Sequence, residues 1–86
     1  MASFESAAER AKKLKKSPSN DELLDLYALY KQATAGDNTT AAPGVLDVKG
    51  KAKWSAWNNK KGVSKDQAKA DYVTLVEKLA AKYGEQ

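Results

Sequence analysis

The sequence predicts an all-α domain of four helices, and three observations in its 86 residues lead to that prediction. Apolar residues recur at spacings of three and four in four segments, helix-breaking residues separate these segments, and no useful length alternates polar with apolar residues. A long irregular stretch between the second and third segments indicates a four-helix bundle with one long crossover. A single domain spanning residues 1–86 is expected, because this length leaves no room for a second core.

The first helix is expected from Phe4 to Lys15 and carries one apolar stripe. The stripe consists of Phe4, Ala7, Ala8, Ala11 and Leu14. Pro18 cannot continue a helix and marks its end. Ser19 and Glu22 have the spacing of a capping box, which starts the second helix. That helix is expected to run to Gly36, a suitable residue to follow a helix end.

Turn-forming residues fill the stretch from Asp37 to about Gly50, where Pro43-Gly44 suits the centre of a type II turn. A shorter third helix is expected over 51–59, carrying Trp54 and Trp57. The two indoles are predicted to be packing anchors, because a small bundle needs bulky core residues.

The fourth helix begins after the break at Gly62, where Ser64 and Gln67 again have the spacing of a capping box. Its apolar face consists of Ala68, Tyr72, Leu75, Val76, Leu79 and Tyr83. Gly84 ends this helix. On the residues alone, Tyr72 is interpreted as a core residue whose hydroxyl reaches the surface.

The composition excludes several functional classes. The chain has no cysteine and no histidine, which removes disulfides, the usual thiolate nucleophile, the usual neutral-pH base and the commonest zinc ligands. Catalysis by Ser, Lys or carboxylates stays open on composition alone, but most familiar routes are closed, and no catalytic residue, metal or cofactor is expected. No apolar run approaches the roughly 20 residues of a membrane span, so a cytoplasmic protein without stable membrane insertion is expected. The net charge of +4 favours anionic partners without identifying one.

The second helix carries more apolar and aromatic surface than one packing neighbour requires. On a helical wheel an arc of roughly 220° holds these residues, whereas one contact needs only about 100°. The arc comprises Leu29, Ala33, Leu26, Tyr30, Leu23, Tyr27, Lys31 and Leu24, leaving Asp25, Ala28 and Gln32 on the remaining face. Two interpretations stay open: packing against two or three helices, or a binding surface in which Tyr27, Tyr30 and Lys31 suit a nucleotide.

A second group of cations lies at Lys49, Lys51 and Lys53, just before Trp54. A solvated helix face explains such a run in the absence of other signals. Lys49 and Lys53 share a face if the third helix starts early.

The motifs taken together closely resemble the acyl-CoA-binding protein family over essentially the whole chain. The matching segments are residues 27–37 (YALYKQATAGD), Pro43-Gly44, residues 49–57 (KGKAKWSAW), Lys61-Gly62, Ser64-Lys65 and Tyr72, with Phe4, Ala7-Ala8 and Lys12 in the first helix. The resemblance implies an up-down-down-up four-helix bundle with a long crossover between helices 2 and 3. It also implies non-catalytic binding of medium- to long-chain acyl-CoA esters by an intracellular carrier and pool former, expected to be a monomer.

The resemblance also implies roles for individual residues. Tyr27, Lys31 and Lys53 hold the ribose 3′-phosphate, Tyr30 stacks on adenine, Lys12 lies near the head group, and Lys49 approaches the ligand from the loop. The full set of expected ligand-binding residues is Lys12, Tyr27, Ala28, Leu29, Tyr30, Lys31, Lys49, Lys53 and Tyr72, with Ala8, Leu23 and Leu24 along the acyl groove. Tyr72 and the stem of Lys53 are expected beside that groove as well.

Three positions depart from the family pattern. Val48 stands where an aromatic or larger apolar residue is common, Leu23 where methionine often occurs, and Ser17 where lysine is frequent before the proline. These changes alter groove width and local charge and therefore affect acyl-chain preference rather than the class of ligand.

Three other functions fit the residues less well. A nucleic-acid-binding domain lacks an Arg-rich helix, since Arg10 is the one arginine. A protein-interaction bundle would show a flat apolar patch and no stabilisation by acyl-CoA. An enzyme that cleaves the thioester would need an activated nucleophile, and the chain has no Cys or His to provide one.

Overall fold

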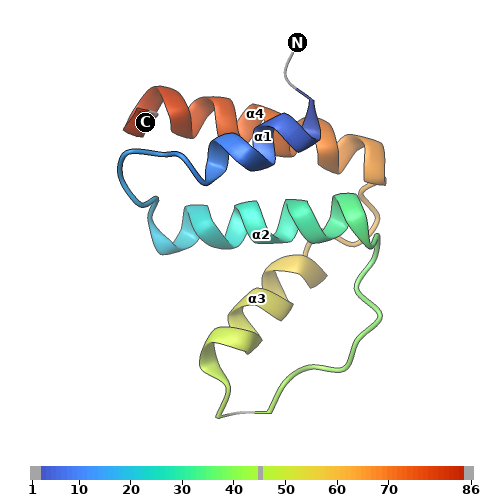
Figure 1. Ribbon diagram of the computed structural model, residues 1–86. Helices are drawn as coiled ribbons and strands as arrows, with labels where there is room; N and C mark the ends of the chain where they lie inside the picture. The colour runs from blue at the N-terminus through green and yellow to red at the C-terminus, as the bar shows by residue number, and fades with distance from the viewer. Residues whose placement is uncertain (1–2, 45, 85–86) are drawn as a thin grey trace.

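A computed structural model describes residues 3–44 and 46–84, which form the helices α1 (Phe4–Ala11), α2 (Asn20–Thr34), α3 (Val48–Asn58) and α4 (Lys65–Tyr83) (Figure 1). α1 and α4 run in one direction, and α2 and α3 run in the other (Figure 1). α4 packs against both α1 and α2, and α3 packs against α2. The predicted all-α bundle with a long α2–α3 crossover is confirmed. No helix in the described ranges is long and apolar enough to cross a membrane.

The core forms where α1 and α2 meet α4. Its buried cluster consists of Ala7, Leu26, Leu29, Tyr72, Val76 and Leu79. Side chains of the predicted α1 stripe, including Phe4, Ala8 and Leu14, pack against this cluster. The predicted apolar faces of α1 and α4 are thus confirmed, because both are turned toward shared buried side chains.

The end of α1 differs from the prediction. The helix ends at Ala11 rather than at Lys15. The Lys13 N–H donates to the Arg10 carbonyl at 2.9 Å, which tightens the last turn. The Lys15 N–H then donates to the Gly84 carbonyl at 2.9 Å. This contact with the end of α4 takes the backbone donor out of a helical path, which the local pattern could not reveal.

The start of α3 also differs from the prediction, because the helix begins at Val48 and not at Lys51. The Asp47 carboxylate accepts a hydrogen bond from the Gly50 N–H at 3.0 Å and so caps the helix. Lys49 therefore lies on the helix and not in the preceding loop. Because α3 starts early, Lys49 and Lys53 both lie on the helix, one turn apart, and this spacing places them on the same face.

The two predicted capping boxes have different outcomes. At α2 both bonds form: the Glu22 N–H donates to Ser19 Oγ at 3.2 Å, and the Ser19 N–H donates to Glu22 Oε1 at 2.8 Å. At α4 the Gln67 N–H donates to Ser64 Oγ at 3.0 Å, but the Gln67 amide donates to Asp71 instead of returning to the cap. Only half of the second box is present. Gly36, with φ of 82°, follows α2 as predicted.

The crossover is held by side chains of α3. The Trp57 indole N–H donates to the Gly36 carbonyl at 2.8 Å, and the Trp54 indole N–H donates to the Thr40 carbonyl at 3.0 Å. Trp57 is buried, which confirms its role as a packing anchor. Asn38 is also buried, and its Oδ1 accepts from the Thr40 N–H and hydroxyl. The long loop is therefore fixed to the helix that it precedes.

The type II turn predicted at Pro43-Gly44 is wrong. Such a turn needs a positive φ at its third residue, and Gly44 is not among the positive-φ glycines of the described chain. The chain turns two residues later, where the Asp47 N–H donates to the Gly44 carbonyl at 3.0 Å. This turn leads directly into the Asp47 cap, so the cap of α3 fixes the position of the turn.

The face of α2 outside the wide apolar arc is largely buried. Ala28 and Gln32 are both completely inaccessible, because α2 packs against α3 as well as α4. The Gln32 amide donates to Asp37 Oδ1 and to the Val63 carbonyl, each at 2.8 Å. A hydrogen bond from the Gly62 N–H, followed by that from Gln32, lowers the pKa of the Asp37 carboxyl. These bonds join the end of α2 to the α3–α4 connection.

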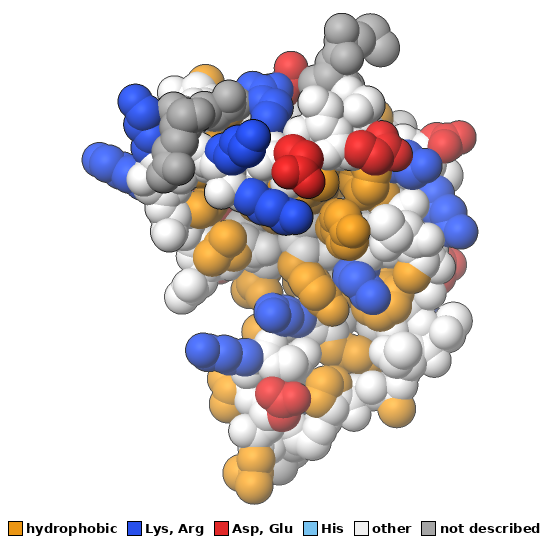
Figure 2. Space-filling view, in the orientation of Figure 1, with side chains coloured by type: hydrophobic (Ala, Val, Ile, Leu, Met, Phe, Trp, Pro, Cys, Tyr) orange, Lys and Arg blue, Asp and Glu red, His pale blue; other side chains and the backbone are white. Residues whose placement is uncertain are grey.

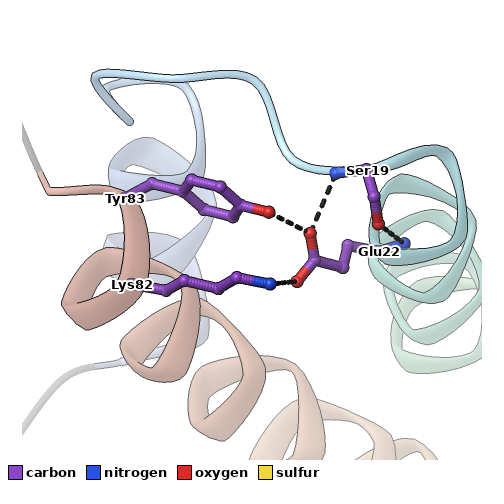
Figure 3. Close-up of polar contacts among 4 residues, drawn as sticks. All are labelled: Ser19, Glu22, Lys82 and Tyr83. Carbon is purple, nitrogen blue, oxygen red and sulfur yellow. Dashed lines mark hydrogen bonds and ion pairs between the residues drawn. The ribbon is translucent and has the colours of Figure 1, made fainter.

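Glu22 connects the start of α2 to the end of α4 (Figure 3). Its Oε1 accepts from the Tyr83 hydroxyl at 2.6 Å, and its Oε2 pairs with Lys82 Nζ at 3.1 Å. The hydrogen bond from Tyr83, and then that from the Ser19 N–H, lower the pKa of Glu22 from 4.5 to about 2. The ionised carboxylate therefore joins α2 to α4 through residues that lie 60 positions apart in the chain, Glu22 and Lys82.

This contact predicts acid sensitivity. Because the pKa of Glu22 is lower in the folded than in the unfolded chain, its stabilisation is complete above its ordinary value of 4.5 and declines as pH falls toward about 2. Glu22→Gln is expected to reduce the loss of thermal stability over that pH range, as followed by circular dichroism. Glu77→Gln, which removes an exposed carboxyl on α4, is the control. Equal effects of the two changes would contradict a specific role for Glu22.

Candidate functional site

A first hollow of about 330 Å³ lies between α1 and α2. It exists because both helices pack on α4 without close backbone contact with each other. The lining residues of this α1–α2 hollow are Ala8, Ala11, Lys12, Leu23, Leu26, Tyr27, Tyr30 and Tyr72. Phenol rings and a lysine thus surround a largely apolar floor.

A second hollow, of about 360 Å³, lies between the first turns of α2 and of α3. The lining residues of this α2–α3 hollow are Asn20, Leu23, Leu24, Val48, Lys49, Ala52 and Lys53. Figure 2 shows a notch in the left edge of the molecule at this level, with basic side chains along its lower border. Leu23 is 45% exposed and lines both hollows, so that they meet at this side chain.

Three aromatic rings gather at the α1–α2 hollow. Phe4 stacks on Tyr30 with ring centroids 5.5 Å apart, and it meets Tyr72 edge-on at 5.1 Å. Burial, and then the nearby Tyr30, raise the pKa of the Tyr72 hydroxyl above its ordinary value of 10.0. Tyr30 remains 43% exposed. The cluster supports this ring from behind and leaves part of its surface free for a planar ligand.

Two lysines lie over aromatic rings beside the hollows. Lys53 Nζ is 5.4 Å from the centre of the Tyr27 ring, which brings α3 and α2 together at the ligand-facing surface. Lys31 Nζ is 4.9 Å from the centre of the Trp57 ring. Within residues 3–44 and 46–84, neither ammonium group forms an ion pair with a carboxylate. Both charges are thus available to an anion, and the rings restrict where the lysine side chains lie.

The structure brings most of the expected site residues together, in two groups. Ala8, Lys12, Tyr27, Tyr30 and Tyr72 surround the α1–α2 hollow, whereas Leu24, Lys49 and Lys53 surround the α2–α3 hollow. The single groove expected from Ala8, Leu23 and Leu24 is therefore two hollows joined at Leu23. Lys31 lines neither and lies beside them over Trp57.

Ala28 and Leu29 were expected to contact a ligand, and their burial does not agree with that expectation. Ala28 has no exposed surface and Leu29 is 6% exposed. Leu29 belongs to the core cluster, and its remaining surface faces a separate depression between α2 and α4. Because α2 is covered on two sides, only one part of its wide apolar arc remains open to a ligand.

Sequence reasoning assigned no site role to several residues at these hollows. They are Phe4, Ala11, Asn20, Leu26 and Ala52. Val48 was expected only to affect the width of the groove, and it lines the α2–α3 hollow. Ala52 follows Val48 by four residues and Lys49 by three, so an early start of α3 would have placed all three on one face. Phe4 was predicted only as part of the α1 stripe. Its contact with Tyr30 depends on the packing of α1 on α4, which no local pattern encodes.

The arrangement suits a ligand with two unlike parts. Exposed phenol and ammonium groups can bind a phosphorylated aromatic base, and the adjoining leucines, valine and alanine can cover an apolar chain. Among the described residues, no cluster of three or more Asp, Glu, His or Cys could hold a metal ion. The chemistry that these side chains offer is therefore binding by charge, stacking and apolar contact.

Comparison with known proteins agrees with this chemistry. A family model described as "Acyl CoA binding protein" matches residues 1–76. "Acyl-CoA-binding protein homolog 1" of Caenorhabditis elegans is 67% identical over 82 residues, which are 95% of each chain. "Acyl-CoA-binding protein homolog" of Drosophila melanogaster is 61% identical over 80 residues, which are 93% of each chain.

Solved structures give the same result at the level of the fold. The crystal structure of Oryza sativa Acyl-CoA-Binding Protein 2 superposes with a TM-score of 0.89 at 48% identity, covering 92% of this chain and 86% of the other. The solution structure of the acyl coenzyme A binding protein from yeast superposes with a TM-score of 0.75 at 50% identity, covering 95% of each chain.

Proposed function

The chain belongs to the acyl-CoA-binding protein family, and from this membership we propose that its two joined hollows form an acyl-CoA site. The function is non-catalytic binding of medium- to long-chain acyl-CoA esters, with the protein acting as carrier and pool former. The proposed unit is one acyl-CoA-binding domain over residues 1–86, working as a cytoplasmic monomer. The observation that carries this proposal is the junction at Leu23 of two hollows, one lined by tyrosines and Lys12, the other by apolar side chains together with Lys49 and Lys53.

The head group is proposed to occupy the side of the site nearest the phenols. Tyr27, Lys31 and Lys53 would hold the 3′-phosphate. Lys53 Nζ lies over the Tyr27 ring, and Lys31 Nζ lies over Trp57, so that both ammonium groups lie between α2 and α3. Tyr30 would stack on the adenine with the face that its contact with Phe4 leaves free. Lys12 lies at the same hollow, and its 3.9 Å pair with Glu9 is exposed and therefore weak enough to release.

The acyl chain is proposed to pass Leu23 and follow the α2–α3 hollow. Leu24, Val48 and Ala52 supply apolar surface there, and the Lys53 stem adds methylene groups. Lys49 lies at the same hollow and can approach the ligand from α3. Ala8 and Tyr72, expected to line the groove, lie on the other side of Leu23, where they would meet the end of the chain that is closest to the head group.

Simple energetics explain why both hollows are needed. Coenzyme A carries a charge of about −4, part of which is the −1.5 to −2 of its monoester phosphate. A sixteen-carbon acyl group offers about 14 methylenes at ~0.8 kcal/mol each, or roughly 11 kcal/mol when fully removed from water. Ordering of the ligand and incomplete burial of its chain reduce this gain in binding free energy by several kcal/mol, on the order of the usual costs of association. The two contributions together reach the ~12 kcal/mol of nanomolar affinity, which neither reaches alone.

A calorimetric titration with palmitoyl-CoA, free CoA and palmitate tests this function. Palmitoyl-CoA is expected to bind at least about a thousandfold more tightly than CoA, a difference of about 4 kcal/mol. Palmitate is expected to bind weakly because it lacks the phosphates that the lysines recognise. Equal affinities for CoA and palmitoyl-CoA would contradict an acyl site. Palmitoyl-CoA recovered intact after prolonged incubation is the expected sign of binding without catalysis.

A further inference from the structure

Two large apolar side chains at the start of α3 remain in water. Leu46 is 95% exposed and Val48 is 74% exposed, more than any other large apolar side chain of the described residues. They lie where the crossover enters α3, at the bottom of the ribbon in Figure 1, and Figure 2 shows hydrophobic side chains at that end. We call Leu46 and Val48, together with Lys49 and Lys51, the α3 tip.

The α3 tip is held in place although its side chains are exposed. Asp47, between the two apolar residues, caps the helix through the Gly50 N–H. The Lys51 N–H donates to the Asp47 carbonyl at 2.9 Å, which completes the first helical bond. The exposure therefore belongs to an ordered helix start, and no part of the core cluster covers it.

The charges at the α3 tip favour an anionic partner. Lys49 follows Val48 directly, Lys51 lies two positions further on, and Lys53 lies one turn after Lys49. Asp47 is the one carboxylate of α3 and its cap, and it already accepts the capping hydrogen bond. Apolar side chains bordered by lysines match the boundary between headgroups and acyl chains of an anionic bilayer, where lysine stems extend their charges toward the phosphates.

The size of the α3 tip favours lipid over a folded protein partner. Stable protein–protein interfaces bury about 1,200 Å² or more and need a packed centre. Two apolar side chains and their neighbouring lysines supply far less than this. A bilayer needs no complementary shape, because a few inserted side chains and several nearby cations suffice for reversible attachment.

The α3 tip is continuous with the α2–α3 hollow, because Val48 lines that hollow and is also exposed at its rim. We propose that the α3 tip docks on anionic lipid bilayers and turns the mouth of the α2–α3 hollow toward the lipid. Docking of the unloaded protein is independent of the proposed acyl-CoA function. Only its consequence, that an acyl chain moves between bilayer and protein without crossing water, rests on that function.

The test is co-sedimentation of the unloaded full chain with vesicles of phosphatidylcholine alone or mixed with phosphatidylglycerol. The wild type is expected to bind the mixed vesicles, to bind them less as salt rises, and to bind pure phosphatidylcholine at least about tenfold more weakly. Absence of binding to the mixed vesicles at low salt overturns the proposal.

Two variants locate the contact. Leu46→Ser removes an inserted side chain, and Lys51→Glu reverses a charge at the same place. Each is expected to weaken binding to mixed vesicles about tenfold, equivalent to about 1.4 kcal/mol. Lys65→Glu makes the same charge change on the exposed first residue of α4 and is expected to have less than about a third of that effect, as distant charges are screened.

The outcomes separate docking from the rival explanations. The proposal is overturned if Leu46→Ser binds the mixed vesicles as tightly as the wild type does. It is also overturned if Lys65→Glu and Lys51→Glu weaken binding equally, because that result assigns the binding to net charge. A concentration-dependent dimer that Leu46→Ser abolishes, without vesicle binding, assigns the α3 tip to a second copy. Leu46 lines neither hollow, so palmitoyl-CoA binding by Leu46→Ser is expected to be unchanged. If the wild type binds vesicles but does not bind palmitoyl-CoA, the proposed function is rejected and the docking proposal stands.

Discussion

Replacing Lys31 and Lys53 together by alanine is expected to weaken palmitoyl-CoA binding by at least about a hundredfold. A hydrogen bond to a charged group contributes about 1.5–3 kcal/mol, so each single change is expected to cost about tenfold or more. The two ammonium groups lie over different rings, Trp57 and Tyr27, and so their removal affects separate contacts. Calorimetry on both single variants and the double variant measures the losses and their additivity.

The control for this prediction keeps the same change in net charge. Lys16→Ala combined with Lys65→Ala removes two exposed cations that line neither hollow. This pair is expected to alter affinity by less than about threefold, because exposed charges at a distance are screened. Wild-type affinity in the Lys31→Ala, Lys53→Ala variant would show that the head group binds elsewhere. Thermal unfolding of each variant confirms that a loss of affinity is not a loss of fold.

Replacing Trp57 by alanine is expected to lower the free energy of unfolding by about 3–5 kcal/mol. The indole is buried, and its N–H donates to the Gly36 carbonyl at 2.8 Å, so that it joins α3 to the end of α2. Small domains have only about 5–15 kcal/mol of stability in total. Trp57→Ala is therefore expected to be partly unfolded at room temperature. Urea denaturation followed by circular dichroism measures this loss.

Trp57→Phe is the matched control for the indole. It keeps most of the buried ring and loses the hydrogen bond to Gly36, for an expected loss of about 1–2 kcal/mol. Because Lys31 lies over the indole, Trp57→Phe is also expected to bind palmitoyl-CoA slightly less tightly. A loss below about 1 kcal/mol in Trp57→Ala would contradict its role as the anchor of α3.

Local features could be predicted from the sequence because short-range chemistry determines them. The Ser19–Glu22 capping box, the glycine after α2 and the α4 apolar face depend on residues within one or two turns. The end of α1 was predicted wrongly, because it depends on a backbone hydrogen bond between Lys15 and Gly84. No pattern near Lys15 contains that information, since its partner lies 69 positions later in the chain.

Most of the residues expected at the site lie at the two hollows, but the shape of these hollows was not predicted. Tyr27, Tyr30 and the lysines followed from the resemblance of their motifs to a known family. Ala28 and Leu29 were expected at the site from the same resemblance, yet packing of α2 against α3 and α4 buries them. The division of the groove at Leu23 and the support of Tyr30 by Phe4 arise from the distances between helices, which a single sequence does not specify.

A crystal structure of the protein with palmitoyl-CoA tests the central claim most directly. The predicted result is adenine against Tyr30, the 3′-phosphate within hydrogen-bonding distance of Tyr27, Lys31 and Lys53, and the acyl chain beyond Leu23 in the α2–α3 hollow. A head group bound away from all three of these polar side chains, or an acyl chain lying outside both hollows, would contradict it.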